Sequence, residues 1–284
     1  MTRLASFVAA ALLLAGCAGS RFASAPEPMD VMSWNIRLDL ASDGPNAWPF
    51  RKETVAARIA GQDLVGVQEA LPSQLADLDV LLPGFARFGL GRDPGGTGEA
   101  CAILYRKDRF DVLEQGTFWL SESPDVAGSR GWDAAYPRIA TWGRLRDRAS
   151  GDVFWHFNTH LDHVGLTARR EGAELLLRKI REIAGTSPRV VVTGDFNAVP
   201  GSEPYVIMTG PLQDALEISR EPHRGPDSTW NGFTKIEPGQ RIDFIFVGSG
   251  FDVLEHAILV ETTPAGRYTS DHFPVVATIV AGAD

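Results

Sequence analysis

The sequence contains little cysteine. Among its 284 residues, cysteine occurs only at Cys17 and Cys101, which allows neither a disulfide framework nor a cysteine-rich zinc site. Cys101 lies in the apolar run Ala100–Tyr105, where an unpaired thiol is expected to act as a small apolar strand residue. A disulfide-stapled scaffold is therefore excluded.

Positive charge is also scarce. The chain has 27 Lys and Arg against 36 Asp and Glu, a formal net charge of −9, with 44% hydrophobic and 22% charged residues. This composition is that of an ordinary soluble globular protein. Because polynucleotides are polyanions, an acidic protein binds them non-specifically only where it has a local basic patch. The net charge therefore disfavours a nuclease without excluding one.

The N-terminal apolar stretch is short. Leu4–Leu14 falls below the roughly 20 residues that a membrane-spanning helix needs, and it follows Arg3, as in a cleaved export signal. The next residues, Leu14–Cys17, look like a bacterial lipobox, in which the cysteine becomes the acylated first residue of the mature chain. A plain secretory signal with an incidental cysteine is the alternative.

These features predict three parts: a lipoprotein signal peptide at residues 1–16, an anchor cysteine with a tether at residues 17–29, and a single domain at residues 30–284. Acyl chains on Cys17 would hold the protein firmly, because each buried methylene contributes about 0.8 kcal/mol. We expect an exported protein attached to a bacterial membrane. Ala18, which is not acidic, favours the outer membrane, on its periplasmic or surface side.

The stretch Val190–Asn197 combines a strand-like run with an acid and an amide at its end. Its β-branched run ends in Gly-Asp-Phe-Asn, which predicts a buried strand. Side chains alternate along a strand, so Asp195 and Asn197 should leave its end on the same face. An acid and an amide placed together suit a hard cation and a phosphoryl oxygen. A simple turn is the alternative, since Asp and Asn beside Gly are common in turns.

Polar residues of the same kind follow or begin several other apolar runs. The residues concerned are Asn35, Glu69, His160 with Asp162, Asp243, and Asp271 with His272. Turn chemistry explains one such place, but not a repeated pattern with these residue types. The repetition predicts a catalytic site assembled from strand ends, and contributions from both ends of the chain favour a single domain.

Helices are expected near residues 51–60, 72–82, 167–184 and 202–209, from apolar residues at helical spacing. Strands are expected near residues 31–34, 64–68, 100–106, 110–121, 153–159, 190–194, 242–247, 251–261 and 274–280. Asp93–Gly98 has turn composition. Many strands, few helices and no regular βαβ repeat indicate a layered α/β or α+β fold.

In order along the chain, six motifs resemble the endonuclease/exonuclease/phosphatase superfamily of metal-dependent phosphoesterases. They are Trp34-Asn35, Gln68-Glu69, Thr159-His160-Leu161, Gly194-Asp195-Phe196-Asn197, Arg241-Ile242-Asp243 and Ser270-Asp271-His272. Together they cover nearly the whole mature chain, and the lipobox suggests a bacterial lipoprotein-type member. The resemblance implies a four-layer α/β sandwich, with two mixed β-sheets face to face flanked by helices.

The available ligands are carboxylate, amide and imidazole groups, which favour Mg²⁺ or Mn²⁺ over structural zinc. Glu69 is the best single metal ligand, because a carboxylate buried after an apolar strand is otherwise a costly unpaired charge. Asn35 and Asp271 are expected to support it.

The resemblance pairs Asp243 with His272. This pair would orient the imidazole and suit it either to activate water or to stabilise phosphoryl charge. Asp195 would position the nucleophile or handle the leaving-group proton, and Asn197 and His160 would donate hydrogen bonds to phosphoryl oxygens. Which residue is general base and which is general acid stays open. A core histidine is the alternative for His272.

Arg138 is the candidate phosphate-binding arginine, because a guanidinium can hold two phosphate oxygens at once. A surface salt bridge is the alternative. Three residues beside the motifs are expected either to set substrate choice or to support their neighbours: Asp133, Asp162 and His163. Glu99 closes the loop at Asp93–Gly98, where the resemblance implies an acid near the catalytic histidine. Residues expected to border the cleft are His223, Trp230 and Lys235.

The sequence therefore predicts a monomeric phosphoesterase that hydrolyses a phosphodiester or phosphomonoester by in-line attack of activated water. The acidic surface and the membrane anchor favour a small organophosphate or a lipid headgroup. A nuclease of the same superfamily is the alternative, with nucleic acid a less favoured partner. From a different class, a non-catalytic binding lipoprotein could retain the fold, but no expected motif residue is missing.

Overall fold

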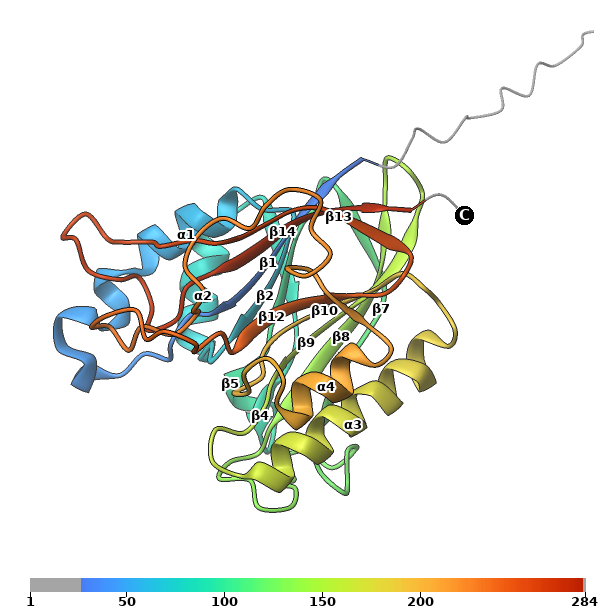
Figure 1. Ribbon diagram of the computed structural model, residues 1–284. Coiled ribbons are helices and arrows are strands. Elements are labelled where there is room, and N and C mark those ends of the chain that lie inside the picture. The colour runs from blue at the N-terminus through green and yellow to red at the C-terminus, as the bar shows by residue number, and fades with distance from the viewer. Residues whose placement is uncertain (1–26, 283–284) are drawn as a thin grey trace, which may run out of the picture.

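Two six-stranded sheets lie face to face in residues 27–282, the part of the chain that the computed structural model describes (Figure 1). The first sheet has the order β13 (Phe251–Ile258), β14 (Val275–Ala281), β1 (Met29–Asn35), β2 (Leu64–Gln68), β6 (Ile103–Arg106) and β3 (Phe85–Phe88). The second has the order β11 (Gln213–Asp214), β12 (Asp243–Val247), β10 (Val190–Asp195), β9 (Val153–His160), β8 (Ile139–Asp147) and β7 (Phe110–Trp119).

Helices cover the outer faces of both sheets (Figure 1). Those on the first sheet are α1 (Lys52–Ala60) and α2 (Pro72–Leu81), and those on the second are α3 (Leu166–Ala184) and α4 (Glu203–Thr209). Short 3₁₀ turns, Ala41–Asn46 and Trp48–Phe50, lead into α1. The resulting order of helix, sheet, sheet and helix confirms the predicted four-layer α/β sandwich.

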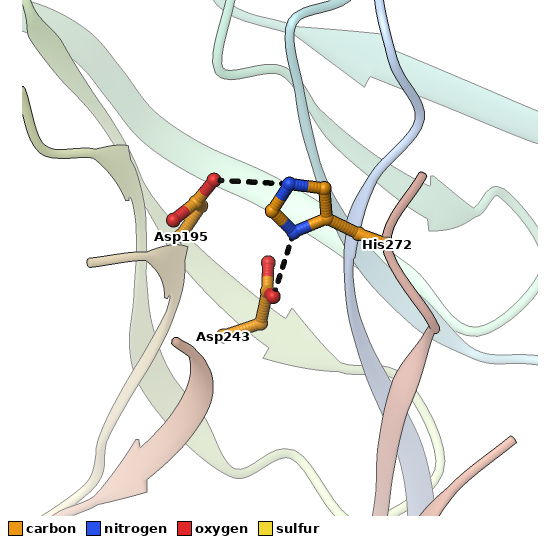
Figure 2. A group of neighbouring side chains, drawn as sticks. All are labelled: Asp195, Asp243 and His272. Carbon is orange, nitrogen blue, oxygen red and sulfur yellow. Dashed lines mark hydrogen bonds and ion pairs between the residues drawn. The ribbon is translucent and has the colours of Figure 1, made fainter. Parts of the chain in front are cut away.

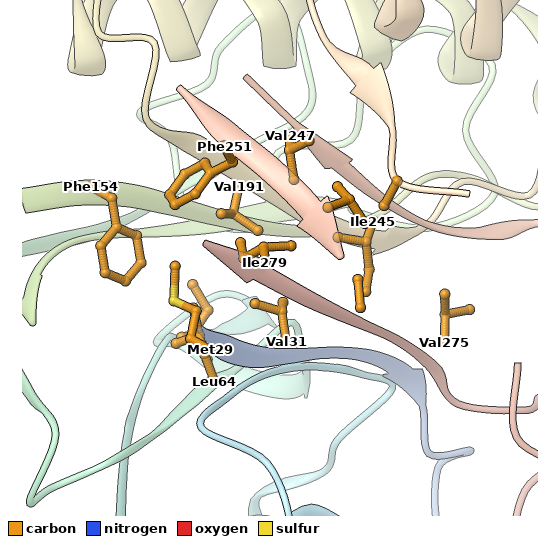
Figure 3. Close-up of a cluster of buried hydrophobic side chains, with 14 of the residues drawn as sticks. Met29, Val31, Leu64, Phe154, Val191, Ile245, Val247, Phe251, Val275 and Ile279 are labelled. Carbon is orange, nitrogen blue, oxygen red and sulfur yellow. The ribbon is translucent and has the colours of Figure 1, made fainter. Parts of the chain in front are cut away.

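Each interface between layers is closed by apolar side chains at alternating strand positions. Between the sheets, Val31, Val191 and Ile279 are among those that meet (Figure 3). Val192, the neighbour of Val191, faces the other way and packs under α3. Full burial of one such side chain contributes about 1.5–3 kcal/mol, so strand alternation fixes which face of Val190–Asp195 meets which layer.

The centre of each sheet is a parallel pair. In the first sheet β1 lies beside β2 with Asn35 opposite Gln68, and in the second β10 lies beside β9 with Asp195 opposite His160. Parallel strands end at the same edge of a sheet. The polar residues that follow these strands therefore gather at one end of the sandwich.

The structure corrects the expectation around residue 93. Residues 91–100 form a hairpin of β4 (Gly91–Asp93) and β5 (Thr97–Ala100) around a turn, so the turn prediction is confirmed but the strands beside it were missed. The chain then leaves regular strand structure until β6 begins at Ile103. None of the helices within residues 27–282 has both the length and the hydrophobicity to cross a membrane.

The first strand already includes Met29, the last residue of the expected tether, which pairs with Ile279 in the first sheet. The predicted signal peptide and the acylation site at Cys17 lie outside the described residues.

Candidate active site

The predicted site residues converge on one cleft of about 470 Å³ at the end of the sandwich. Its lining includes these predicted residues: Glu69, Arg138, His160, Asp195, Asn197, Asp271 and His272. Asn35 and Asp243 lie directly behind this lining and are fully buried. A volume of this size falls within the roughly 300–1,000 Å³ typical of small-molecule sites.

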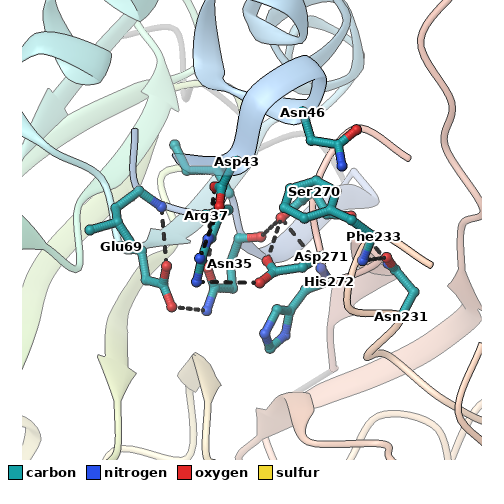
Figure 4. A network of polar contacts seen from close by, with 12 residues as sticks. Asn35, Arg37, Asp43, Asn46, Glu69, Asn231, Phe233, Ser270, Asp271 and His272 are labelled. Atoms are coloured by element: carbon teal, nitrogen blue, oxygen red, sulfur yellow. Dashed lines mark hydrogen bonds and ion pairs between the residues drawn. The ribbon is translucent and has the colours of Figure 1, made fainter. Parts of the chain in front are cut away.

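Asn35 joins the two sheets at the floor of the cleft. Its Nδ2 atom donates to Oε1 of Glu69 at 2.9 Å and to Oδ2 of Asp195 at 3.0 Å, and its Oδ1 atom accepts from the backbone N–H of Arg37. The other oxygen of Glu69 accepts from the backbone N–H of Leu38 (Figure 4). These bonds hold two carboxylates from different sheets close to the same amide.

Backbone strain is concentrated around this floor. Glu69 has φ 61°, Asn197 φ 46° and Arg37 φ 56°. Residues with a side chain rarely adopt this left-handed region, at a cost of about 1–3 kcal/mol each. Within residues 27–282, the other non-glycine residues with positive φ are Trp132 and Phe233. The fold therefore holds the strand-end side chains in unusual directions, as functional sites commonly do.

His272 lies between two carboxylates (Figure 2). Its Nδ1 atom is 2.9 Å from Oδ2 of Asp243, and its Nε2 atom is 3.8 Å from Oδ2 of Asp195. Burial alone disfavours the imidazolium, but the charges of Asp243 and Asp195 outweigh it and raise the pKa of His272 well above its ordinary value. The ring therefore favours the doubly protonated, positively charged form.

The pKa of Asp195 is also raised by its surroundings. Burial, reinforced by repulsion from Asp243, raises the pKa of its carboxyl to about 7, although His272 and the Asn35 amide act in the opposite direction. An acid that titrates near neutral pH can accept a proton during catalysis. Burial and the neighbouring charges thus favour an imidazolium at His272 beside an Asp195 carboxyl that titrates near neutral pH.

His160 and Asn197 also contact the Asp195 carboxylate. The Nε2 atom of His160 is 3.0 Å from Nδ2 of Asn197 and 3.3 Å from Oδ2 of Asp195. Asn197 also donates through its backbone N–H to Oδ1 of Asp195 and through Nδ2 to the carbonyl of Leu161. Burial and the nearby Arg138 charge lower the pKa of His160 well below its ordinary value, so this imidazole is neutral.

Arg138 is a buried residue of the cleft, not a surface arginine. Only 5% of it is exposed, its Nε donates to Oδ2 of Asp162 at 3.3 Å, and one terminal nitrogen lies 2.9 Å from Nδ1 of His163. Tyr136 stacks on the His163 ring with a centroid separation of 5.9 Å. The guanidinium is therefore held in place from two sides.

Asp162 organises the loop that carries Arg138. Its carboxylate accepts backbone N–H groups from Ala135, Val164 and Gly165 at 2.7–3.1 Å. Burial opposes its ionisation, but these hydrogen bonds prevail and lower its pKa to about 2. The residue does not line the cleft, so it supports its neighbours.

Asp133 likewise supports the fold, by capping a helix. Its carboxylate accepts the N–H groups of Thr167 and Ala168 in the first turn of α3, a capping interaction supplied from a distant loop. His163, in contrast, lines the cleft.

Only some of the other residues predicted near the cleft line it. Trp230 and Glu99 do line the cleft. His223 instead pairs with His256, and Lys235 pairs with Glu237, and neither is part of the lining. Sequence reasoning missed Arg37, which lies 3.6 Å from Asp271 and also binds Asp43, and missed Arg92 and Tyr136. These three stand on loops or in the unrecognised hairpin, where no strand-end pattern marks them.

A buried polar network lies directly beneath the cleft. Gln68 and Thr193 both donate to Oδ1 of Asn158, at 2.7 and 3.0 Å. Nδ2 of Asn158 donates to the backbone carbonyls of Val67 in β2 and of Ala102, just before β6. Gly66 permits this approach, because a Cβ atom there would lie 2.1 Å from Oγ1 of Thr193. The network ties together the strands whose ends carry the candidate site residues.

The donor set suits a hard divalent cation. Glu69 and Asp271 present oxygen ligands to the cleft, and burial together with repulsion from Glu69 raises the pKa of Asp271. A cation between these carboxylates would relieve that repulsion, and oxygen ligands favour Mg²⁺ or Mn²⁺.

A second grouping is also compatible with a metal ion. Ligand atoms of Asp195, Asp243 and His272 lie within 4.8 Å of one another. The 2.9 Å contact between His272 and Asp243 is a hydrogen bond, however, in which the ring Nδ1–H donates to the carboxylate, so these two atoms already satisfy each other. We therefore favour the grouping around Glu69.

Solved structures with the same fold include close relatives. A Bacteroides vulgatus endonuclease/exonuclease/phosphatase is 41% identical, with a TM-score of 0.86, and the match covers 90% of this chain and 100% of that one. The mannosyl-6-phosphatase Bt3783 of Bacteroides thetaiotaomicron is 36% identical, with a TM-score of 0.82 and coverage of 89% and 99%.

A more distant likeness extends to the catalytic domain of human Nocturnin with bound sulfate. It is 21% identical, with a TM-score of 0.68 and coverage of 90% and 94%, and supports the fold alone. No curated protein matches this chain in sequence.

The sequence pattern that defines the Endonuclease/Exonuclease/phosphatase family matches residues 32–272 of this chain, which span the first to the last of the predicted motifs. The chain therefore belongs to the Endonuclease/Exonuclease/phosphatase family.

Proposed function

We propose that this protein is a divalent-metal-dependent phosphoesterase that removes phosphate from a small sugar phosphate. The observation that carries the proposal is the His272 ring held between Asp243 and Asp195 at the cleft. The 36% identity to a mannosyl-6-phosphatase over nearly the full length of both chains supports a sugar monoester.

The side chains have separate roles in an in-line displacement. Asp195 accepts a proton from the attacking water, because its pKa lies near 7. The His272 imidazolium, stabilised by Asp243, donates to a phosphoryl oxygen on which negative charge develops. Asn197, His160 and Arg138 orient the remaining oxygens.

Glu69, Asn35 and Asp271 would hold Mg²⁺ or Mn²⁺. When bound, such an ion neutralises charge on the phosphate and stabilises the leaving oxygen. The Asn35 amide donates hydrogen bonds to both the Glu69 and the Asp195 carboxylates and so holds them close together. The ion and the base would therefore act on the same phosphate.

A polynucleotide fits the cleft less well. The guanidinium groups of its lining are each paired with an acid: Arg37 with Asp43 and Asp271, Arg92 with Glu99, and Arg138 with Asp162. Tracking a nucleic-acid backbone needs a row of cations that are not already neutralised. A nuclease therefore remains a less favoured alternative.

Export and attachment are part of the proposal. The lipobox supports acylation of Cys17, and the non-acidic Ala18 supports a location on the outer membrane. The catalytic domain would act as a monomer on a soluble substrate. Cys17→Ser should move the protein from the membrane fraction to the soluble fraction of cells.

The proposal is tested by hydrolysis of four substrates, with Mg²⁺ or Mn²⁺ and with chelator. The products measured are inorganic phosphate from mannose 6-phosphate, p-nitrophenol from bis(p-nitrophenyl) phosphate, phosphocholine from sphingomyelin and shortened strands from single-stranded DNA. We expect metal-dependent turnover that is fastest on mannose 6-phosphate. Faster cleavage of DNA would favour the nuclease, and binding without turnover of any ester would favour a non-catalytic protein.

A further inference from the structure

One end of the cleft carries groups that phosphate cleavage does not require. Arg92 and Glu99 come from the β4–β5 hairpin, and Tyr136 from the loop before β8. A small recess at the cleft base is lined by this pair together with Glu69, Arg138 and His160. The pair therefore adjoins the groups proposed to bind the metal and the phosphate.

The Arg92–Glu99 pair is held rigidly. The two terminal nitrogens of Arg92 lie 2.9 and 2.5 Å from the two oxygens of Glu99, a bidentate arrangement. Only 12% and 14% of the two side chains are exposed. The indole N–H of Trp119 donates to the Arg92 carbonyl at 2.7 Å. Such an arrangement presents fixed hydrogen-bonding groups to the cleft.

Tyr136 links this pair to the phosphate side. The Arg92 guanidinium lies 4.8 Å from the centre of the Tyr136 ring, and the same ring stacks on His163, which contacts Arg138. Half of Tyr136 is nevertheless exposed. An exposed aromatic edge beside paired polar groups offers both apolar and hydrogen-bonding contact.

The charge balance indicates which ligand fits. Arg92 and Glu99 neutralise each other. Among residues 27–282, this end of the cleft therefore offers no unpaired cation for a second phosphate and no unpaired acid for a quaternary amine. Paired charges still form strong hydrogen bonds with neutral hydroxyl groups, because Glu99 accepts and Arg92 donates. The ligand best matched is uncharged and rich in hydroxyl groups.

We propose that Arg92, Glu99 and Tyr136 form a subsite for the hexose ring of the substrate. The inference rests on the proposed function and extends it, by assigning substrate choice to the hairpin and the Tyr136 loop. Glu99 and Arg92 bind hydroxyl groups of the ring, and Tyr136 packs against its C–H surface.

The test compares kcat/KM for mannose 6-phosphate with kcat/KM for n-propyl phosphate, which has the ester but no ring or free hydroxyl groups. In Glu99→Gln and in Tyr136→Ala, we expect the ratio of the two values to fall about 10- to 100-fold, the effect of a lost hydrogen bond to a charged group or of a lost aromatic contact. An unchanged ratio in both variants would overturn the subsite.

Matched controls lie away from the cleft. Glu114→Gln removes the same charge from an exposed pair with Arg144, and Phe50→Ala removes a ring that is 65% exposed. Neither should change the ratio. A control that lowers it as much as Glu99→Gln does would also contradict the subsite.

A binding measurement separates failure of the subsite from failure of the proposed function. Calorimetric titration of mannose 6-phosphate into the protein with chelator should show affinity that Glu99→Gln weakens at least 10-fold. If the wild type binds in this way but hydrolyses no ester, the proposed function is wrong and the subsite stands. If the wild type shows no binding, or binding that is equal in Glu99→Gln, the subsite is wrong.

Discussion

The Nδ1 atom of His272 lies 2.9 Å from Oδ2 of Asp243, in a region where both residues are buried. The other oxygen of Asp243 has no hydrogen-bond partner within residues 27–282. A buried carboxylate with one free oxygen is costly unless its charge serves a purpose. Here the charge keeps the ring oriented and protonated.

Asp243→Asn should therefore lower kcat at least 100-fold, because burial without the opposing charge depresses the pKa of His272. The amide is nearly the same size, so the urea midpoint of unfolding should change little. Parallel measurement of kcat and of the urea midpoint checks this. A variant that retains more than a tenth of the activity would contradict the role given to the pair.

Metal binding should depend on Glu69. A ligand at 100 times its Kd stabilises the folded state by about 2.7 kcal/mol, so Mg²⁺ or Mn²⁺ should raise the melting temperature of the wild type. Glu69→Gln should lose that rise, whereas Asp243→Asn should keep it. The reverse result would place the ion at the group of Asp195, Asp243 and His272.

Asp162→Asn should weaken substrate binding through Arg138. The neutral amide accepts the N–H groups of Ala135, Val164 and Gly165 less strongly and no longer pairs with the guanidinium. We expect KM to rise about 10-fold with a smaller change in kcat, together with a loss of stability of about 1–3 kcal/mol. Steady-state kinetics and urea unfolding of the variant measure these two changes. An unchanged KM would contradict the role given to Asp162 in positioning Arg138.

Acid should destabilise the fold through His156. Burial lowers its pKa to about 3 from 6.5, and its Nε2 atom lies 2.8 Å from Thr193 Oγ1. Between these pKa values the unfolded chain binds the extra proton, so stability falls as the pH drops below about 6.5. His156→Gln should reduce the slope of unfolding free energy between pH 6 and pH 4 by about 1.4 kcal/mol per pH unit. An equal slope would show that this histidine titrates normally.

Strand alternation and the polar residues at strand ends predicted the layers and most of the site. Asn35, Glu69 and Asp195 could be recognised because each follows an apolar run whose direction places its end at a common edge. A carboxylate in an apolar strand needs a partner, and the family resemblance identified His272 as the partner of Asp243.

Contacts made by loop residues could not be predicted from the sequence. Arg92 and Tyr136 meet across a hairpin and a long loop, and no sequence spacing connects them. Asp133 resembled a site residue because it stands beside one, yet its carboxylate caps a helix that begins more than thirty residues later. Residues that act through tertiary contact have no local signature, so their roles depend on the assembled fold.

The most direct test of the central claim is the turnover number of Asp195→Asn on mannose 6-phosphate with saturating Mg²⁺, beside the wild type. If Asp195 accepts the proton of the attacking water, the variant should lose at least 100-fold in kcat while it still binds the substrate. Turnover within 10-fold of the wild type would contradict the account, because the cleft would then cleave phosphate without the base on which the mechanism depends.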